Sequence, residues 1–315
     1  MSKLKFNKRK IENIIKKIFP KSHIDKYEQF STGLVSPTFK LKLGNSSKIL
    51  VVKLSKLKNK GRISLNNKVL NYLNEQGIPA PKVYFEGQID RKFISIMEYS
   101  SGKVASSLYK SCNQGLRKNI LISAGENLRK IHKLNMPSFW IHQHHEIKNQ
   151  KEWKKWTKLR INKYTKFFKK KFSNYIDFIE EELVGFYNIL EKEKIDFVPL
   201  HWDYHLSNLN VNSMGNITGT FDFDNAMKGH SLADLGQTAY WIRFEMQDSK
   251  NFKYFLKGYK NSFSKKELKL IRGYYLLHLL AVSRTIWFRQ KRLSWIIDRH
   301  KEILEELKKL KLCSS

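Results

Sequence analysis

The N-terminal third of the chain alternates between helical and strand-like patterns of apolar residues. Residues 8–19 place isoleucines at helical spacing, and Pro20 ends the helix that this spacing predicts. Residues 63–74 show the same spacing, with Leu and Val on one face. Runs rich in apolar and β-branched residues, bounded by Gly, Ser, Asn and Pro, predict strands at 27–30, 38–43, 48–54 and 93–99. This order predicts a small antiparallel sheet accompanied by helices.

The remainder of the chain is mainly helical in pattern. Helical spacing begins near residue 119. Residues 268–288 and 295–312 place apolar residues along one helical face and charged residues on the opposite face. Residues 140–195 interleave aromatic residues with lysines. Such a segment could bind single-stranded nucleic acid, but at helical spacing these aromatics are more typical of a core.

A short hairpin interrupts this helical region. Residues 209–211 and 217–221 are β-prone, and Ser, Met, Gly and Asn at 213–216 are typical of a turn. One arm begins directly after Asn208 and the other ends at Asp222. We therefore expect the hairpin to bring these two side chains together.

The pair has a chemical use. Amide and carboxylate oxygens are hard ligands, suited to a Mg²⁺ ion that also binds nucleotide phosphates. Asp203 lies earlier on the same loop, in a position to accept the proton of an attacking hydroxyl. A base, an Asn and an Asp on metal are the parts that phosphoryl transfer requires.

The same stretch resembles the aminoglycoside phosphotransferase and choline kinase superfamily. The loop of that family has His, any residue, Asp, four residues and Asn, which His201, Asp203 and Asn208 match. The metal-binding Asp of the family follows a hairpin, as Asp222 does, and its downstream Asp-Leu pair corresponds to Asp234 and Leu235. Residue types, spacing and strand context agree, which makes the match more specific than a bare His-x-Asp.

The resemblance implies an α+β, two-lobed, protein-kinase-like fold. Residues 1–98 would form a nucleotide-binding lobe with an antiparallel sheet, and residues 99–315 a mainly helical lobe for catalysis and substrate binding, with a hinge at about 98–102. The activity implied is transfer of the γ-phosphoryl group of ATP or GTP to a hydroxyl of a small-molecule acceptor. The helical insertion at 140–195 would shape the acceptor site.

The resemblance also assigns roles within the loop and hairpin. Asp203 would be the catalytic base, or would orient the acceptor hydroxyl. Asn208 and Asp222 would bind Mg²⁺, while His201 and Asp234 would brace the loop.

Nucleotide-binding residues follow from the same resemblance. Lys53, which ends the apolar run 49–54, would bind the phosphates of the nucleotide. Ser36 lies in a hairpin loop at the position where kinase-like folds cover the phosphates. Backbone groups of Met97, Glu98 and Tyr99 would bind the adenine.

The chain departs from the family pattern at two places. Trp202 stands where the family usually has Gly, and no Asp or Glu lies between Lys53 and Glu75 to pair with that lysine. Ser64, Asn66 or Asn67 occupies the expected position of the acid, and an amide could orient Lys53 without a charge pair. Asp224 is a second candidate for contact with the metal or the acceptor, but it is interpreted as a surface residue that follows the motif. The missing acid leaves a nucleotide-binding pseudokinase as an alternative.

The net charge of +32, from 60 Lys and Arg against 28 Asp and Glu, favours anionic partners. A nucleic-acid-binding protein on a kinase-like scaffold is therefore a second alternative, although the basic residues are spread along the chain as an AT-rich genome would produce. Polycationic acceptors would be repelled, so an anionic or neutral polyol, sugar or metabolite is expected.

Other features of the composition suggest where the protein resides. The longest apolar run, at 274–282, is interrupted by His278 and is too short to cross a bilayer. The Lys-rich N-terminus does not have the pattern of a secretory signal. Two cysteines cannot form a disulfide framework, so a cytoplasmic location is expected.

Overall fold

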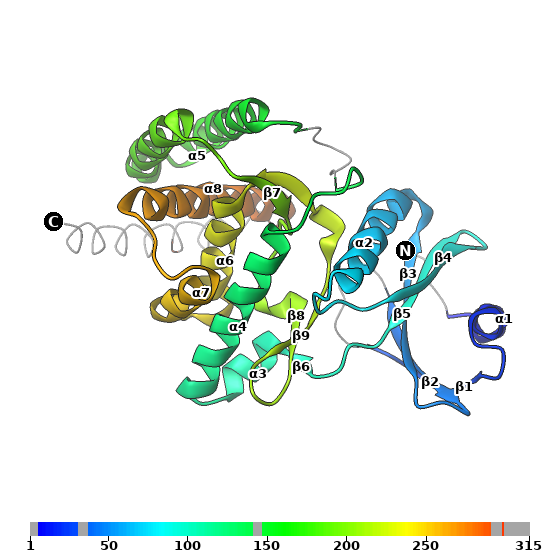
Figure 1. Cartoon of the computed structure of the whole chain (residues 1–315). Coiled ribbons are helices and arrows are strands. Elements are labelled where there is room, and N and C mark those ends of the chain that lie inside the picture. Colours follow the sequence, from blue (N-terminus) through cyan, green and yellow to red (C-terminus); the bar gives the residue numbers. More distant parts are fainter. Residues whose placement is uncertain (1–5, 31–36, 141–146, 291–297, 299–315) are drawn as a thin grey trace.

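The structure is a computed structural model that describes residues 6–30, 37–140, 147–290 and 298. Its N-terminal part is built on a five-stranded antiparallel sheet with the strand order β1-β2-β3-β5-β4. The strands are β1 (His23–Gln29), β2 (Thr38–Gly44), β3 (Ile49–Lys56), β4 (Val83–Ile89) and β5 (Lys92–Glu98). The predicted antiparallel sheet is confirmed, and Figure 1 shows it beside the mainly helical remainder of the chain.

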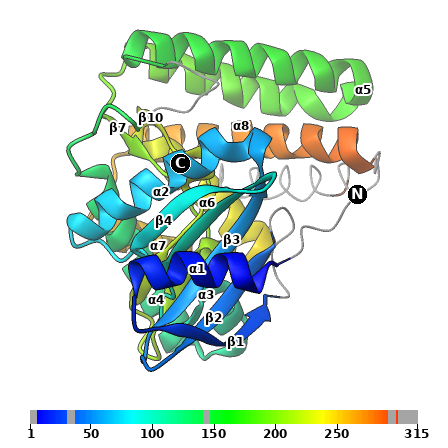
Figure 2. The same ribbon diagram turned by 90° about the vertical axis from the view of Figure 1, so that its right-hand side faces the viewer.

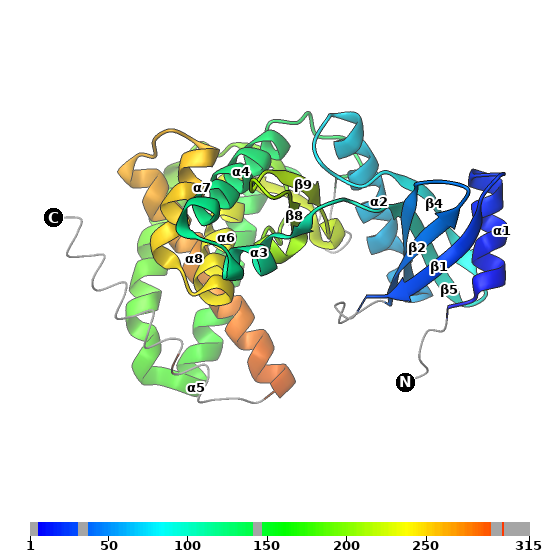
Figure 3. The same cartoon turned by 90° about the horizontal axis from the view of Figure 1, so that it is seen from below.

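Two helices accompany the sheet, one on each face. α1 (Lys8–Ile18) buries Ile11 and Ile15 against Leu41, Val52 and Ile96 of the sheet. α2 (Lys60–Glu75) lies on the opposite face, between the sheet and the helical region (Figures 1 and 3). Since side chains alternate along a strand, the burial of Leu50, Val52 and Leu54 toward α1 turns Lys53 toward the helical region.

The helical region contains six α-helices among the described residues. They are α3 (Ala105–Ser111), α4 (Gln114–His132), α5 (Gln150–Lys192), α6 (Ser231–Met246), α7 (Phe252–Tyr259) and α8 (Lys265–Gln290). α5 turns back on itself, so that Lys154 near its start donates hydrogen bonds to the carbonyls of Glu191 and Glu193 at its end, at 2.9 and 2.7 Å. Figure 2 shows its two limbs lying beside α8.

Two small sheets position the loop that carries the sequence motif. β7 (Phe197–Leu200) pairs with β10 (Met227–His230), and the hairpin β8 (Leu209–Val211) and β9 (Ile217–Thr220) pairs with β6 (Lys103–Val104). The predicted hairpin is therefore present. Two short 3₁₀ segments, η2 (Leu206–Asn208) and η3 (Phe223–Asn225), flank it.

The molecule has two hydrophobic cores, and α2 belongs to the larger one. The smaller core lies between α1 and the sheet. The buried face of α2, including Leu65, Val69 and Leu73, joins the core of the helical region. Tyr72 of α2 also donates a hydrogen bond to the carbonyl of Asn135, at 2.5 Å. The predicted division at residues 98–102 therefore does not coincide with the boundary between the cores, and the domain limits stay a prediction.

Some predictions fall outside the described residues, among them the phosphate-covering loop with Ser36 and the helix expected at 295–312. In the part of the chain that the structure describes, no helix is both long and apolar enough to cross a membrane.

Candidate active site

The loop between β7 and β8 is anchored by a buried carboxylate. Asp234, in the first turn of α6, is fully buried and accepts hydrogen bonds from the backbone N–H groups of His201 and Trp202, at 2.8 and 3.0 Å. Its Oδ2 also lies 3.1 Å from Nε2 of His132. These bonds and the helix N-terminus stabilise a charge that would otherwise be expensive to bury. The position of Asp234 fits the loop-bracing role expected of it.

His201 is also placed as an anchor. Its ring is fully buried, its Nε2 lies 2.8 Å from the carbonyl oxygen of Phe221, and its centroid lies 4.2 Å from that of Phe223. Burial lowers the pKa of His201 to about 4. The ring is therefore neutral near pH 7 and ties the loop to the far arm of the hairpin.

Trp202 adopts the left-handed backbone conformation, with φ of 62°. This region favours glycine because a side chain there crowds the backbone, which explains the usual Gly at this position. The indole packs 5.7 Å from Trp153 and 5.6 Å from Trp156 between ring centroids. These contacts and the bond to Asp234 hold the strained residue in place.

Asp203 is in a protected environment at the edge of a cavity. Burial raises its pKa to about 6; the nearby His205 acts in the opposite direction, and the negative charge of Asp222 adds to the increase. Nε2 of His205 lies 3.8 Å from Oδ1 of Asp203, and its Nδ1 lies 3.3 Å from Oε2 of Glu245. A carboxylate with a pKa near 6 is still mostly ionised at pH 7, as a base requires.

His205 and Glu245 form a pair that we did not expect from the sequence. Burial alone would lower the pKa of His205, but the hydrogen bond with Glu245 and the charge of Asp203 outweigh it and raise that pKa. The pair therefore favours the protonated imidazole beside Asp203.

Asn208 and Asp222 are brought together as the hairpin predicted. The N–H of Phe221 donates to the carbonyl of Asn208 at 3.0 Å, which sets Asp222 beside that residue. The Asn208 side-chain N–H donates to the backbone carbonyl of Asp203 at 3.0 Å. Within the described residues, neither Oδ1 of Asn208 nor the carboxylate of Asp222 is engaged in a hydrogen bond or ion pair. Both remain available as metal ligands.

The fit to Mg²⁺ rests on these oxygens. Mg²⁺ is commonly held by one or two protein oxygens together with substrate phosphates and water. Among the described residues, no group of three or more His, Cys, Asp or Glu side chains is arranged to hold a metal ion.

The partner of Lys53 corrects our interpretation of Asp224. Nζ of Lys53 lies 3.7 Å from Oδ1 of Asp224, and both side chains are only 21% exposed. Burial raises the pKa of Asp224, and the charge of Lys53 opposes this. Asp224 is therefore not a surface residue that merely follows the motif, and it supplies an acid for Lys53 from outside α2.

The amides of α2 do not replace the missing acid. Asn67 accepts a hydrogen bond from the Ser95 hydroxyl at 2.9 Å and donates to Glu86 at 2.8 Å, while Ser64 also donates to Glu86 at 2.8 Å. Asn66 instead accepts the backbone N–H of Phe223 at 2.9 Å. The sequence left open that an amide of α2 orients Lys53, but these side chains bind the sheet and the segment after Asp222 instead.

The hinge residues are partly used by the sheet. The N–H of Glu98 donates to the carbonyl of Lys82 at 2.8 Å, and that of Tyr99 to the carbonyl of Ile49 at 3.1 Å. Met97 is paired with Val51 and Val83. The N–H groups of Glu98 and Tyr99 are thus already hydrogen-bonded within the protein. Adenine binding by Met97, Glu98 and Tyr99 stays a prediction, and it would have to use other backbone groups of these residues.

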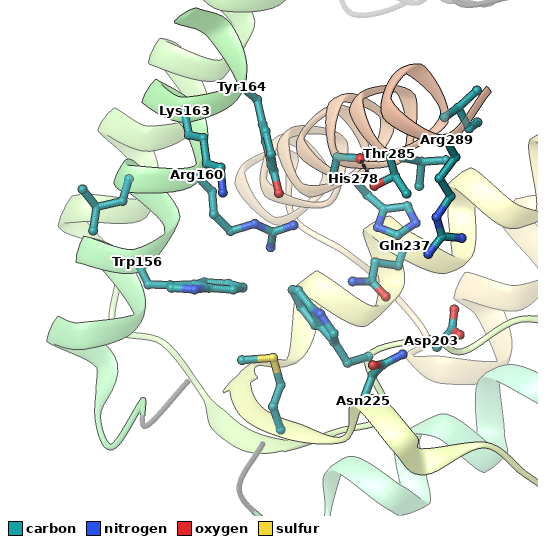
Figure 4. Close-up of a pocket in the computed structure, with 16 residues that line it drawn as sticks. Trp156, Arg160, Lys163, Tyr164, Asp203, Asn225, Gln237, His278, Thr285 and Arg289 are labelled. Carbon is teal, nitrogen blue, oxygen red and sulfur yellow. Dashed lines mark hydrogen bonds between the residues drawn. The ribbon is translucent and has the colours of Figure 1, made fainter. Parts of the chain in front are cut away.

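A cavity of about 670 Å³ opens on the helical side of Asp203. Figure 4 shows Trp156, Arg160, Lys163 and Tyr164 of α5 on one wall and His278, Thr285 and Arg289 of α8 on another. Of the expected nucleotide-binding residues that the structure describes, which are Lys53, Met97, Glu98 and Tyr99, none lines it. The geometry separates a cavity at Asp203 from the side of the site that carries Lys53.

A model of the APH family, described as the phosphotransferase enzyme family, matches residues 26–264. The chain belongs to this phosphotransferase family. No curated protein matches the sequence.

Solved structures show the same fold at low sequence identity. The aminoglycoside phosphotransferase APH(4)-Ia has a TM-score of 0.68 at 15% identity, with 95% of this chain and 99% of that chain covered. A thermostable mutant of it in complex with ADP and hygromycin B gives 0.67 at 14% identity, with 94% and 98% covered. A putative fructosamine-3-kinase from Haemophilus somnus gives 0.63 at 15% identity, with 93% and 96% covered. The phosphotransferase fold is therefore shared with these proteins.

Proposed function

We propose that this member of the phosphotransferase family is a small-molecule kinase, which transfers the γ-phosphoryl group of ATP or GTP to a hydroxyl group. The single observation that carries the proposal is the convergence of Asp203, Asn208 and Asp222 on one anchored loop and hairpin. Neighbours of the same fold were solved with ADP and with AMP-PNP, which supports a nucleotide as donor.

In the proposed reaction the acceptor oxygen forms a bond to the γ-phosphorus, and the bond from that phosphorus to the β–γ bridging oxygen breaks. ADP or GDP leaves, and the hydroxyl proton passes to Asp203 and then to solvent. Asn208 and Asp222 would hold Mg²⁺, which neutralises phosphate charge when bound. Lys53, oriented by Asp224, would bind the phosphates.

Two observations bear on the alternatives. The pseudokinase interpretation rested on the missing acid of α2, and Asp224 now provides an acid 3.7 Å from Lys53. The nucleic-acid interpretation drew on the aromatic segment, but Trp140, Trp153 and Phe168 are fully buried and unavailable for stacking on bases. Both observations favour the kinase.

The test is incubation of the protein with Mg-ATP and a metabolite extract, with mass spectrometry to detect new monophosphate products. We expect a product with the wild type and a rate at least about 100-fold lower with Asp203→Asn, because general-base catalysis contributes about 10²–10⁴-fold. Asp25→Asn, an exposed carboxylate of β1, is the matched control and should retain activity. Absence of any product while Mg-ATP still binds would refute the kinase and favour a nucleotide-binding protein.

A further inference from the structure

The charges that line the cavity beside Asp203 are unbalanced. Arg160, Lys163 and Arg289 carry positive charge there, and among the described residues Asp203 is the sole lining carboxylate. His278, which also lines the cavity, is neutral near pH 7 because burial lowers its pKa to about 3. A ligand in this cavity therefore meets a positively charged surface, with the carboxylate of Asp203 at its edge.

Arg160 is held in place by aromatic rings. Its guanidinium lies 4.5 Å from the ring centroid of Trp156, 5.4 Å from that of Trp202 and 5.6 Å from that of Tyr164. Aromatic faces of this kind could bind an ammonium group of a ligand, but here the protein's own cation already occupies them. The site is thus closed to the cation–π recognition that a quaternary amine would need.

The donors of Arg160 are not consumed by the protein. Stacking leaves the edge of a guanidinium free to donate, and Arg160 has no hydrogen bond or ion pair to any residue in the described ranges. Lys163 and Arg289, both exposed, likewise form no ion pair with the described residues. Three cations facing one cavity without anionic partners repel one another unless an anion joins them.

Buried polar atoms on the cavity wall also lack partners. Gln237 is only 3% exposed, and its Oε1 forms no hydrogen bond among the described residues. The same holds for Nε2 of His278. Unsatisfied buried polar groups are unfavourable, and both of these side chains belong to the wall of the cavity.

We propose that this cavity binds an anionic, hydroxylated small molecule, with a phosphate or carboxylate group held by Arg160 and assisted by Lys163 or Arg289. Given the proposed kinase function, on which this assignment of an acceptor rests, one hydroxyl of the ligand lies at Asp203 and receives the phosphoryl group. Gln237 and His278 make the wall beside this ligand polar. A sugar acid or a sugar phosphate has this chemistry, and a polycationic aminoglycoside does not.

The binding test does not require turnover. Calorimetric titrations at two salt concentrations, with Mg-ADP present, would compare gluconate, glucose 6-phosphate and inorganic phosphate with neutral glucose and with hygromycin B. We expect at least one anionic probe to bind about tenfold or more tighter than glucose, and hygromycin B to bind no better than glucose.

The variants decide whether the anion lies at the proposed position. Arg160→Gln should weaken the anionic probe about tenfold or more, because a charge-assisted bidentate contact is lost, and Arg160→Lys should restore part of it. Lys151→Gln, an exposed lysine near the start of α5, removes the same charge outside the cavity and should change binding less than about twofold. Thermal unfolding of each variant would verify that it is folded.

Three outcomes are distinguishable. Binding of an anionic probe that depends on Arg160, without any phosphorylated product, would retain the anion site and refute the kinase. Phosphorylation of hygromycin B or of neutral sugars, with no effect of Arg160→Gln on the KM of the acceptor, would retain the kinase and overturn the anion site. Failure of every anionic probe to bind, or equal losses in Arg160→Gln and Lys151→Gln, would also overturn it.

Discussion

Single residues in the site combine backbone strain with buried charge. Trp202 and Asp222 both adopt left-handed conformations with φ of 62°, which costs about 1 kcal/mol or more for a residue with a side chain. Each is held by its surroundings, Trp202 through Asp234 and Asp222 through the hairpin. Strain of this kind persists where a precise position is useful, and here it places the Trp202 side chain in the cavity wall and Asp222 next to the residue that is bonded to Asn208.

The Lys53–Asp224 pair gives the first prediction at this scale. Asp224→Asn should raise the KM for Mg-ATP about three- to tenfold, because Lys53 loses the charge that orients it, while the KM for the acceptor stays nearly unchanged. Steady-state kinetics with each substrate varied in turn would measure this. Asp248→Asn, far from Lys53, serves as a comparison, and an equal effect of both substitutions would contradict the orienting role.

At the scale of elements, α2 connects the sheet to the segment after β9. Its Asn67 and Ser64 bind Glu86 of β4, and its Asn66 binds the backbone of Phe223. Arg62 donates to the side chain of Asn225 at 2.9 Å. The helix therefore fixes the position of Asp222 and Asp224 relative to the sheet through neutral amides and one arginine.

This arrangement predicts the result of restoring the family's acid on α2. Asn67→Glu should not lower the KM for Mg-ATP, because the new carboxylate would face Glu86, whose oxygen lies 2.8 Å from the present amide. We expect the free energy of unfolding to fall by about 1–3 kcal/mol from repulsion and the lost hydrogen bond to Glu86.

Urea denaturation would measure this change. The control is Lys68→Glu, which introduces a carboxylate at an exposed position of the same helix. A stable Asn67→Glu variant with tighter Mg-ATP binding would show that position 67 faces Lys53.

The sequence predicted those parts of the site whose residues lie near one another in the chain. The strands, the hairpin and the loop from His201 to Asn208 follow from local periodicity, turn chemistry and spacing. The Lys53–Asp224 and His205–Glu245 pairs did not, because each joins elements that meet only after folding. The same is true of the cavity, whose walls come from α5 and α8. Local sequence patterns do not show how helices that are distant in the chain pack against each other.

For the whole molecule, charge and buried histidines determine the response to pH. The net charge of +32 favours expansion of the chain and grows as pH falls. His230 is 4% exposed, with Nδ1 3.0 Å from the hydroxyl of Tyr274, and burial lowers its pKa to about 3. In the unfolded chain its pKa is about 6.5, so below that pH the unfolded state binds a proton that the folded state does not.

The protein should therefore lose stability as pH falls from 6.5 toward 3. His230→Asn, which retains an acceptor for Tyr274, should reduce the loss between pH 7 and 5.5 by about 1 kcal/mol. Urea denaturation at both pH values would measure the difference, with exposed His23→Asn as control. Identical pH dependence in wild type and His230→Asn would show that His230 is protonated in the fold.

The membership of α2 in the larger core has a mechanical consequence. Tyr72, Asn66 and the apolar face of this helix attach it to the helical region, while polar bonds to Glu86 and Ser95 join it to the sheet. The helix is thus held from two sides at once, and any displacement of the sheet relative to the helical region would have to break one of these two sets of contacts. The Lys53–Asp224 contact spans the same boundary, so such a displacement would break it as well.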